Sequence, residues 1–326
     1  MSHEVAAYRD GVRAGDRRSI AKAITLIESR RADHAALGQT LLDELVPYTG
    51  VAVRLGVTGT PGVGKSTFIE ALGLQLIASG KRVAVLAVDP SSPRTGGSIL
   101  GDKTRMERLA QDPAAFIRPS PSGGSLGGVA HRTRETMLVL EAAGFDVVIV
   151  ETVGVGQSEF TVASMVDFFA VLLQPGAGDE LQGMKKGVLE LADALVVNKA
   201  DGEQRDAAGR ARIAYQHALG LLRPTSAHWR PPVLLASAVS GEGIAEFWEQ
   251  VIAHRAALEA SGEIETRRAA QARAWLWTLV DESLHRSFRS HPAVARAIPR
   301  LEAEVSARRT TPGAAARALL DAFRDR

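Results

Sequence analysis

Residues 59–66 read Gly-Thr-Pro-Gly-Val-Gly-Lys-Ser, a glycine and a Gly-Lys-Ser triplet separated by four positions. The stretch follows an apolar run at residues 51–57 and precedes a helical pattern that begins at Thr67. A strand, a glycine-rich turn and a helix in this order form a loop whose backbone N–H groups surround phosphate. An ordinary strand-to-helix turn would meet all the fixed positions only by chance. We therefore predict a nucleotide-binding α/β domain.

Individual positions of this loop predict individual contacts with a nucleoside triphosphate. The Lys65 ammonium would reach the β- and γ-phosphates, and the Ser66 hydroxyl would ligate Mg²⁺. The helix that follows would add the positive end of its dipole. The predicted phosphate-binding residues are Gly59, Pro61, Gly62, Val63, Gly64, Lys65, Ser66 and Thr67.

Composition argues against several other classes of protein. The 326 residues include 39 Lys and Arg against 37 Asp and Glu, so no charge excess predicts a nucleic acid or a membrane as partner. The absence of cysteine excludes disulfides and thiolate metal sites. No apolar run is long enough to span a bilayer, and the N-terminus lacks the apolar stretch of a signal peptide. We therefore expect a cytoplasmic protein.

Short apolar runs recur along the middle of the chain and predict strands of one sheet. They lie at residues 51–57, 83–88, 147–150, 168–173, 194–197 and 233–236. Their lack of alternation indicates strands that are buried on both faces, as in a parallel sheet. Helical patterns at 66–79, 129–143 and 181–191 separate them. The prediction is a doubly wound, mainly parallel sheet with ligand loops at the carboxyl ends of its strands. The patch at 119–128 is rich in Pro, Ser and Gly and predicts a loop.

Helical patterns also precede and follow the predicted sheet. Gly11 and Gly15 are predicted to break the chain, and residues 16–31 after them have the pattern of a capped amphipathic helix. Three further helices are predicted at 267–290, 293–307 and 312–324. The predicted domains are an N-terminal helical extension at 1–50, a P-loop domain at 51–262 and a C-terminal helical arm at 263–326.

The C-terminal arm contains two tryptophans, Trp275 and Trp277, which point to nearly opposite sides of a helix. Apolar residues lie between them, and a helix that is apolar all round needs partners on two sides. We predict that the arm joins two subunits of a homodimer. The alternative is a helical cap that packs within one chain.

Residues 198–201, Asn-Lys-Ala-Asp, follow a predicted buried strand and match the guanine-binding pattern N-K-x-D. The Asp201 carboxylate can accept from N1–H and from the exocyclic amine of guanine, whereas adenine presents an acceptor at the equivalent ring nitrogen. Ser237 and Ala238 follow the next strand and resemble the short motif behind the guanine O6. The predicted base contacts are Asn198, Lys199, Asp201, Ser237 and Ala238, and the ligand is GTP or GDP. A plain strand-ending turn is the alternative.

The strand at 147–150 ends in Glu-Thr-Val-Gly, residues 151–154, where most GTPases carry D-x-x-G. Glu151 could hold a Mg²⁺-bound water, and the Gly154 N–H could meet the γ-phosphate. Asp89 and Asp102 are further candidates for the metal shell, although each could be a solvated turn residue. Gln157 could orient the attacking water. The predicted catalytic residues are Lys65, Glu151, Gly154 and Gln157, and the predicted metal ligands are Ser66, Asp89, Asp102 and Glu151.

Five stretches together carry a family resemblance: residues 59–66, 89–106, 151–159, 174–187 and 198–201. They resemble the MeaB/ArgK family, the methylmalonyl-CoA mutase-associated GTPases, over most of residues 15–260. The resemblance implies a homodimer that binds the adenosylcobalamin-dependent mutase. It also implies that GTP binding and hydrolysis gate cofactor loading, and that the mutase is protected from inactivation.

The same resemblance implies an additional switch at residues 176–187, with Asp179, Gln182 and Lys185 as contacts that report nucleotide state to the partner. A solvated strand-to-helix connection is the alternative. Two other functions stay open for the whole chain. One is metal delivery of the nickel type, whose GTPases also carry Glu at the position of Glu151, and the other is an ATP-using kinase linked to amino-acid transport.

Overall fold

The computed structural model describes residues 2–29, 31–88, 106–119, 126–152, 158–175, 186–222 and 225–324. The chain divides into two compact units, Met1–Ala269 and Ala270–Arg326. The first unit holds the sheet, and the described part of the second unit is helical. Among the described residues, no helix is both long enough and apolar enough to cross a membrane.

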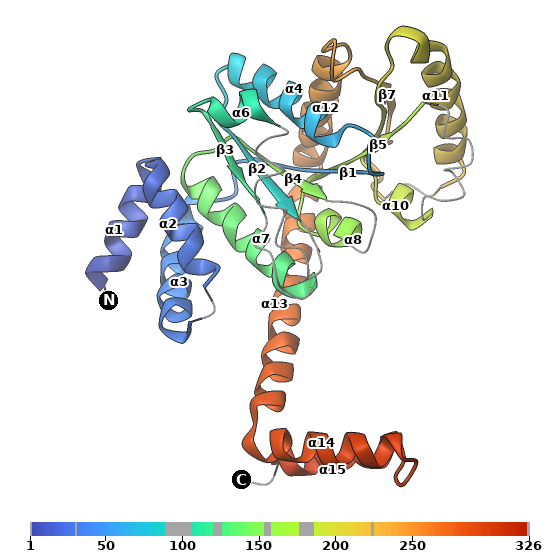
Figure 1. Cartoon of the computed structure of the whole chain (residues 1–326). Helices are drawn as coiled ribbons and strands as arrows, with labels where there is room; N and C mark the ends of the chain where they lie inside the picture. Colours follow the sequence, from blue (N-terminus) through green and yellow to red (C-terminus); the bar gives the residue numbers. More distant parts are fainter. Residues whose placement is uncertain are drawn as a thin grey trace. The chain divides into compact units, whose positions relative to one another are not determined.

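Seven strands form one sheet in the order β3-β2-β4-β1-β5-β6-β7, and every neighbouring pair is parallel (Figure 1). The strands are β1 (Val53–Gly59), β2 (Val83–Val88), β3 (Ala115–Arg118), β4 (Val147–Thr152), β5 (Phe168–Leu173), β6 (Ala194–Val197) and β7 (Val233–Leu235). The predicted parallel sheet is therefore confirmed. Strand β3 was not predicted.

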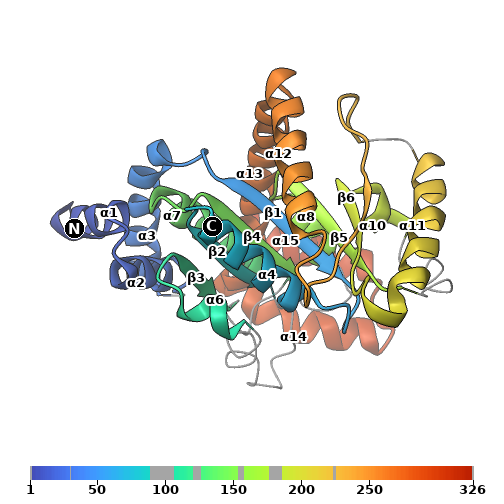
Figure 2. The ribbon, with the colours of Figure 1, turned by 90° about the horizontal axis from the view of Figure 1, so that it is seen from above.

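Helices cover both faces of the sheet and create two apolar cores. Leu55 and Val57 of β1 face the core that also holds residues of α4 (Lys65–Ala78), α6 (Glu107–Gln111) and α12 (Ile244–Ala260). Figure 2 shows α4 and α12 lying over this face. The other core includes residues of α7 (Leu126–Ala142), α8 (Ser158–Ala163), α10 (Lys186–Glu190) and α11 (Arg205–Gly220), which follows the short helix η2 (Gly202–Gln204).

The two central strands send their connections to opposite faces. Strand β1 continues into α4 on one face, and β4 is followed along the chain by α8 on the other. In an open parallel sheet, this divergence opens a crevice at the carboxyl ends of the two strands, where ligands bind. The fold thus places the phosphate loop and Glu151 side by side at the mouth of that crevice.

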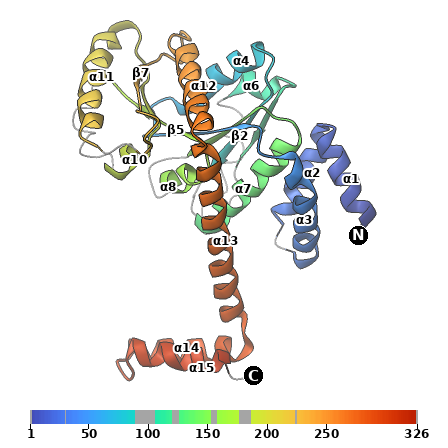
Figure 3. The same ribbon diagram turned by 180° about the vertical axis from the view of Figure 1, so that it is seen from behind.

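The N-terminal helices α1 (Ser2–Arg13), α2 (Arg17–Ile27) and α3 (Ala32–Leu45), with the short helix η1 (Val46–Tyr48), pack against α7 (Figure 3). The predicted break at Gly11 is wrong, because Gly11 lies inside α1. A Cβ at Gly11 would lie 2.4 Å from Ser19 Oγ, so the missing side chain lets α1 approach α2. The chain turns instead at Gly15, where φ is +70°.

Helix α2 also contacts the edge strand β3. The backbone N–H of Val83 donates to Ala114 O at 3.0 Å, and alternation along the ladder then directs the Ala115 carbonyl to the open edge of the sheet. Arg17 Nη1 donates to that carbonyl at 2.7 Å. The edge strand is therefore occupied by a side chain of the helical extension.

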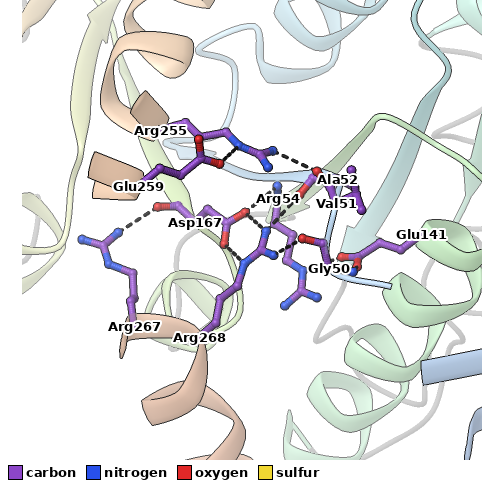
Figure 4. A network of polar contacts seen from close by, with 10 residues as sticks. All are labelled: Gly50, Val51, Ala52, Arg54, Glu141, Asp167, Arg255, Glu259, Arg267 and Arg268. Carbon is purple, nitrogen blue, oxygen red and sulfur yellow. Dashed lines mark hydrogen bonds and ion pairs between the residues drawn. The ribbon is translucent and has the colours of Figure 1, made fainter. Parts of the chain in front are cut away.

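The start of α13 (Glu263–Ser290) is fixed to the amino ends of the strands, opposite the crevice (Figure 4). Arg268 donates to Asp167 from Nε at 2.8 Å and from Nη2 at 2.6 Å. The backbone N–H of Arg54 donates to the same carboxylate at 3.0 Å, and Arg267 Nη1 donates to Asp167 O at 2.8 Å. These contacts explain why the first compact unit extends to Ala269.

The second unit contains the rest of α13, α14 (Pro292–Ser306) and α15 (Pro312–Arg324), in agreement with the three predicted helices. The rings of Phe288 and Phe323 lie 5.3 Å apart and join α13 to α15. Trp277 is 64% exposed and Leu276 57% exposed in the single chain. The domain boundary at residue 263 stays a prediction.

Two of the predicted local boundaries changed. Helix α7 begins at Leu126, so residues 126–128 of the predicted loop at 119–128 are helical, while 120–125 lie outside the described residues. The helix expected at 181–191 is described only as α10, because 181–185 also lie outside the described residues.

Candidate nucleotide-binding site

The phosphate loop joins the last residue of β1, Gly59, to the first residue of α4, Lys65. Two of its glycines, Gly62 and Gly64, have positive φ angles of 80° and 94°. A Cβ at Gly64 would lie 2.8 Å from Asn198 Nδ2, and one at Gly59 would lie 2.5 Å from Leu172 O. Glycine is required here because the backbone lies directly against its neighbours.

Lys65 turns back over the loop that precedes it. Its Nζ donates to Gly59 O at 2.8 Å and to Thr60 O at 3.3 Å. The side chain is buried, and Lys65 is the first residue of α4, at the positive end of the helix dipole. A buried ammonium next to a helix N-terminus creates a positive site that suits phosphate.

Glu151 lies at the carboxyl end of β4, paired in register with Val57 of β1. Its side chain is only 4% exposed. The Ser66 hydroxyl donates to Glu151 Oε1 at 3.2 Å. A hydroxyl and a carboxylate this close form the hard oxygen donor set that Mg²⁺ prefers, so the residues present fit the predicted ion.

The predicted guanine motif contacts the phosphate loop directly. Asn198 Nδ2 donates to Val63 O at 2.8 Å, and Lys199 Nζ donates to Gly62 O at 2.7 Å. Lys199 has a φ of +60°, which is uncommon outside glycine and directs its side chain toward the loop. Sequence segments about 135 residues apart are thus joined into one site.

The remaining predicted base contacts lie next to Asn198 and Lys199. The Ser237 hydroxyl donates to Asp201 Oδ2, and the Ala238 backbone N–H donates to Asn198 Oδ1 at 3.3 Å. Ser237 Oγ also accepts from the Ser240 N–H at 3.1 Å, so the loop after β7 is tied to the hydroxyl that holds Asp201. The Ser237 hydroxyl thus fixes both the Asp201 carboxylate and the loop after β7.

Sequence reasoning missed one contact of this loop, an ion pair between Arg205 at the start of α11 and Glu242. The pair joins the chain after Asp201 to the loop after β7. No local pattern predicts it, because the two residues lie 37 positions apart and both are exposed.

Two other predicted site residues, Pro61 on the loop and Thr67 on α4, are exposed. The predicted residues that lie outside the described residues are Asp89, Asp102, Gly154, Gln157, Asp179, Gln182 and Lys185.

A family model described as methylmalonyl-CoA mutase-associated GTPase MeaB matches residues 20–293. The matched range contains every residue of the site. Among solved structures, that of an LAO/AO transport system kinase is 42% identical, with a TM-score of 0.78 over 98% of both chains.

Curated relatives agree with this match. A putative GTPase of Caulobacter vibrioides is 57% identical over 95% of both chains. The GTPase ArgK of Escherichia coli is 55% identical over 84% of this chain and 82% of its own. The mouse protein named methylmalonic aciduria type A homolog, mitochondrial, is 45% identical over 97% of this chain and 79% of its own. The chain therefore belongs to the MeaB family of methylmalonyl-CoA mutase-associated GTPases, and the reaction that its site performs is the hydrolysis of GTP.

Proposed function

We propose that this GTPase is a chaperone of adenosylcobalamin-dependent methylmalonyl-CoA mutase. In this role it gates loading of the cofactor and protects the mutase from inactivation. The observation that carries the proposal is the family match across residues 20–293, because the family is named for its association with this mutase. The names of the GTPase relatives favour GTP hydrolysis over the transport-kinase alternative. The family description, which names a mutase, favours the chaperone over metal delivery.

For the chemistry, we propose that Lys65 neutralises charge between the β- and γ-phosphates. Ser66 and Glu151 would hold Mg²⁺, with Asp89 and Asp102 as further ligands, and the bound ion would supply positive charge next to the transferred phosphoryl group. The 3.2 Å contact between Ser66 and Glu151 supports this pairing.

Recognition of guanine is assigned to Asp201. Asn198 and Lys199 attach the guanine-binding segment to the phosphate loop. The hydroxyl of Ser237 holds the Asp201 carboxylate in place. The Ala238 N–H, which donates to Asn198 Oδ1 in this structure, would donate to the guanine O6 when the base binds. The contacts from Asn198 and Lys199 to the loop support this assignment.

Gly154 and Gln157 are proposed to sense the γ-phosphate and to orient water. A site without an assigned arginine finger should be slow alone, with a rate of ~10⁻⁴ to 10⁻² s⁻¹, as intrinsic GTPases are. The mutase or a second subunit would supply the missing acceleration.

Asp179, Gln182 and Lys185 are proposed to report nucleotide state to the mutase. The test is GTP hydrolysis with and without purified mutase, in the wild type and in Lys185→Ala. We expect basal turnover within a few-fold of wild type but loss of most of the acceleration, because a relay need not touch phosphate before the partner arrives. Lys22→Ala, at an exposed lysine of α2, is the matched control and should retain full acceleration.

Two results would contradict these proposals separately. If the mutase neither binds nor accelerates the wild-type chain, the chaperone function is wrong. If the mutase accelerates Lys185→Ala as strongly as wild type, the function stands and the assignment of Lys185 is wrong.

A further inference from the structure

Two buried hydroxyls meet where the two central strands part. Thr58 Oγ1 of β1 and Thr152 Oγ1 of β4 lie 2.7 Å apart. Thr58 is 1% exposed and Thr152 is fully buried. Along the chain, Thr58 immediately precedes Gly59 of the phosphate loop, and Thr152 immediately follows Glu151.

Backbone pairing between β1 and β4 ends one residue earlier, at Val57 and Glu151. Beyond that point, β1 still pairs with β5 through Gly59, and β4 still pairs with β2 through Thr152. Each central strand is thus held by its outer neighbour as the crevice opens. At the level of the crevice floor, the hydrogen bond between the threonines joins the two halves of the sheet.

The threonines do not face the nucleotide side of the sheet. Side chains alternate along a strand, so Thr152 lies on the opposite face from Glu151, and Thr58 on the opposite face from Val57. Val57 belongs to the core under α4, whereas Val150, two residues before Thr152, belongs to the core on the side of α7 and α8. The hydroxyl pair therefore acts on the site only through the backbone.

We propose that Thr58 and Thr152 are positioning residues for GTP hydrolysis. Their hydrogen bond fixes the distance between the strand that begins the phosphate loop and the strand end that carries Glu151. This keeps the Glu151 carboxylate at Ser66. The inference rests on the proposed metal role of Ser66 and Glu151, and it concerns how the fold holds those two groups together.

Valine substitutions separate this role from simple stability. Thr58→Val or Thr152→Val leaves one buried hydroxyl without its partner, which is unfavourable. Replacing both threonines removes both polar groups and keeps a similar shape, so stability should largely return. The link across the crevice is absent in all three variants. A purely structural pair would regain function together with stability in the double variant, whereas a positioning pair would not.

The experiment uses the full chain and three measurements on each variant. These are thermal unfolding, affinity for GDP and for a non-hydrolysable GTP analogue, and single-turnover GTP hydrolysis across a range of Mg²⁺ concentrations. Each single valine variant should lower the melting temperature by roughly 3 °C or more. The double variant should melt near wild type but hydrolyse GTP roughly tenfold more slowly, and it should need roughly tenfold more Mg²⁺, the effect of losing one good hydrogen bond.

Three comparisons complete the test. Thr152→Ser keeps the hydroxyl and should retain the wild-type Mg²⁺ requirement, whereas Thr152→Ala should not. Thr40→Val removes a helix-surface hydroxyl that bonds to Ala36 O at 3.0 Å, and it controls for the substitution itself. If the double valine variant folds poorly, the comparison of serine with alanine at position 152 decides.

A double valine variant with wild-type rate and Mg²⁺ requirement would overturn the inference, as would equal behaviour of the serine and alanine variants. The proposed metal role has its own test in Ser66→Ala and Glu151→Gln. An unchanged Mg²⁺ requirement in these two variants would contradict that role and not the threonine pair.

Discussion

Glu135, on α7, is a carboxylic acid held in the core, with 7% of its surface exposed. Burial raises the pKa of its carboxyl to about 7, and the charge of Arg132 opposes that rise. His131 Nε2 lies 3.4 Å from Glu135 Oε1 and adds a favourable contact when it is protonated. The native state therefore holds this proton more tightly than the unfolded chain does.

A pH dependence of stability follows. Between about pH 4.5 and pH 7 the native state binds more protons at Glu135 than the unfolded chain does. The contribution of Glu135 to the free energy of unfolding therefore falls as pH rises, and it is constant above pH 7. Glu135→Gln should match wild type near pH 4.5 and exceed it by about 3 kcal/mol above pH 7. Urea unfolding from pH 5 to pH 8 measures the difference, with exposed Glu4→Gln as control. A difference that does not change with pH would contradict the prediction.

Asp201 carries the prediction for base selectivity. Asp201→Asn replaces an acceptor by an amide, which can donate to the carbonyl that xanthine has in place of the guanine amine. We expect GTP affinity to fall about 100-fold and xanthosine triphosphate to bind better than GTP, because a charge-assisted hydrogen bond is lost. Calorimetry with both nucleotides measures this. Unchanged GTP affinity would remove Asp201 from base recognition.

At the scale of elements, the anchoring of α13 predicts an unequal response of two arginines on one helix. Arg268 pairs with buried Asp167, whereas Arg273 is exposed. Arg268→Ala should cost about 3–5 kcal/mol of unfolding free energy, because the buried carboxylate loses its cation. Arg273→Ala should stay within about 0.5 kcal/mol of wild type. Equal denaturant midpoints for the two variants would show that the Asp167 contact contributes little.

Local pattern predicted every strand of the sheet except β3, whereas it missed the helices α11 and α12. Strands β2, β5 and β6 match their apolar runs from end to end. Strand β3 is as short as β6, but it ends in a charged residue, Arg118, which interrupts its apolar pattern. Helix α11 buries little beyond Ala208 and Tyr215, and this leaves almost no periodicity to detect.

In the candidate site, too, the sequence predicted local motifs and missed contacts between distant segments. The phosphate loop and the N-K-x-D motif have fixed local spacing, so the sequence alone predicts their residues. The sequence does not predict the contacts between distant segments, because Thr58 meets Thr152 and Arg205 meets Glu242 only after the strands pair. The spacing of a motif indicates its chemistry, whereas tertiary contacts determine what holds it in place.

For the whole molecule, exposed apolar residues of the second unit carry the prediction of a homodimer. Trp277, Leu276 and Leu284 are all more than half exposed in the single chain. Covering them in a subunit interface would remove apolar surface from water. We expect the full chain to sediment as a dimer at micromolar concentration and Trp277→Glu to sediment as a monomer. A wild-type chain that sediments as a monomer would contradict the proposed arm.

The hydrogen bond from Arg17 of α2 to β3 also bears on how the sheet edge can meet another copy of the chain. An open edge strand offers unpaired backbone groups on which another chain can add a strand, and this is a route to aggregation. Arg17 occupies the outward carbonyl of Ala115, so the edge offers one acceptor fewer. The helical extension, in which no residue of the proposed site lies, would in this way make edge-to-edge pairing between two copies of the sheet less favourable.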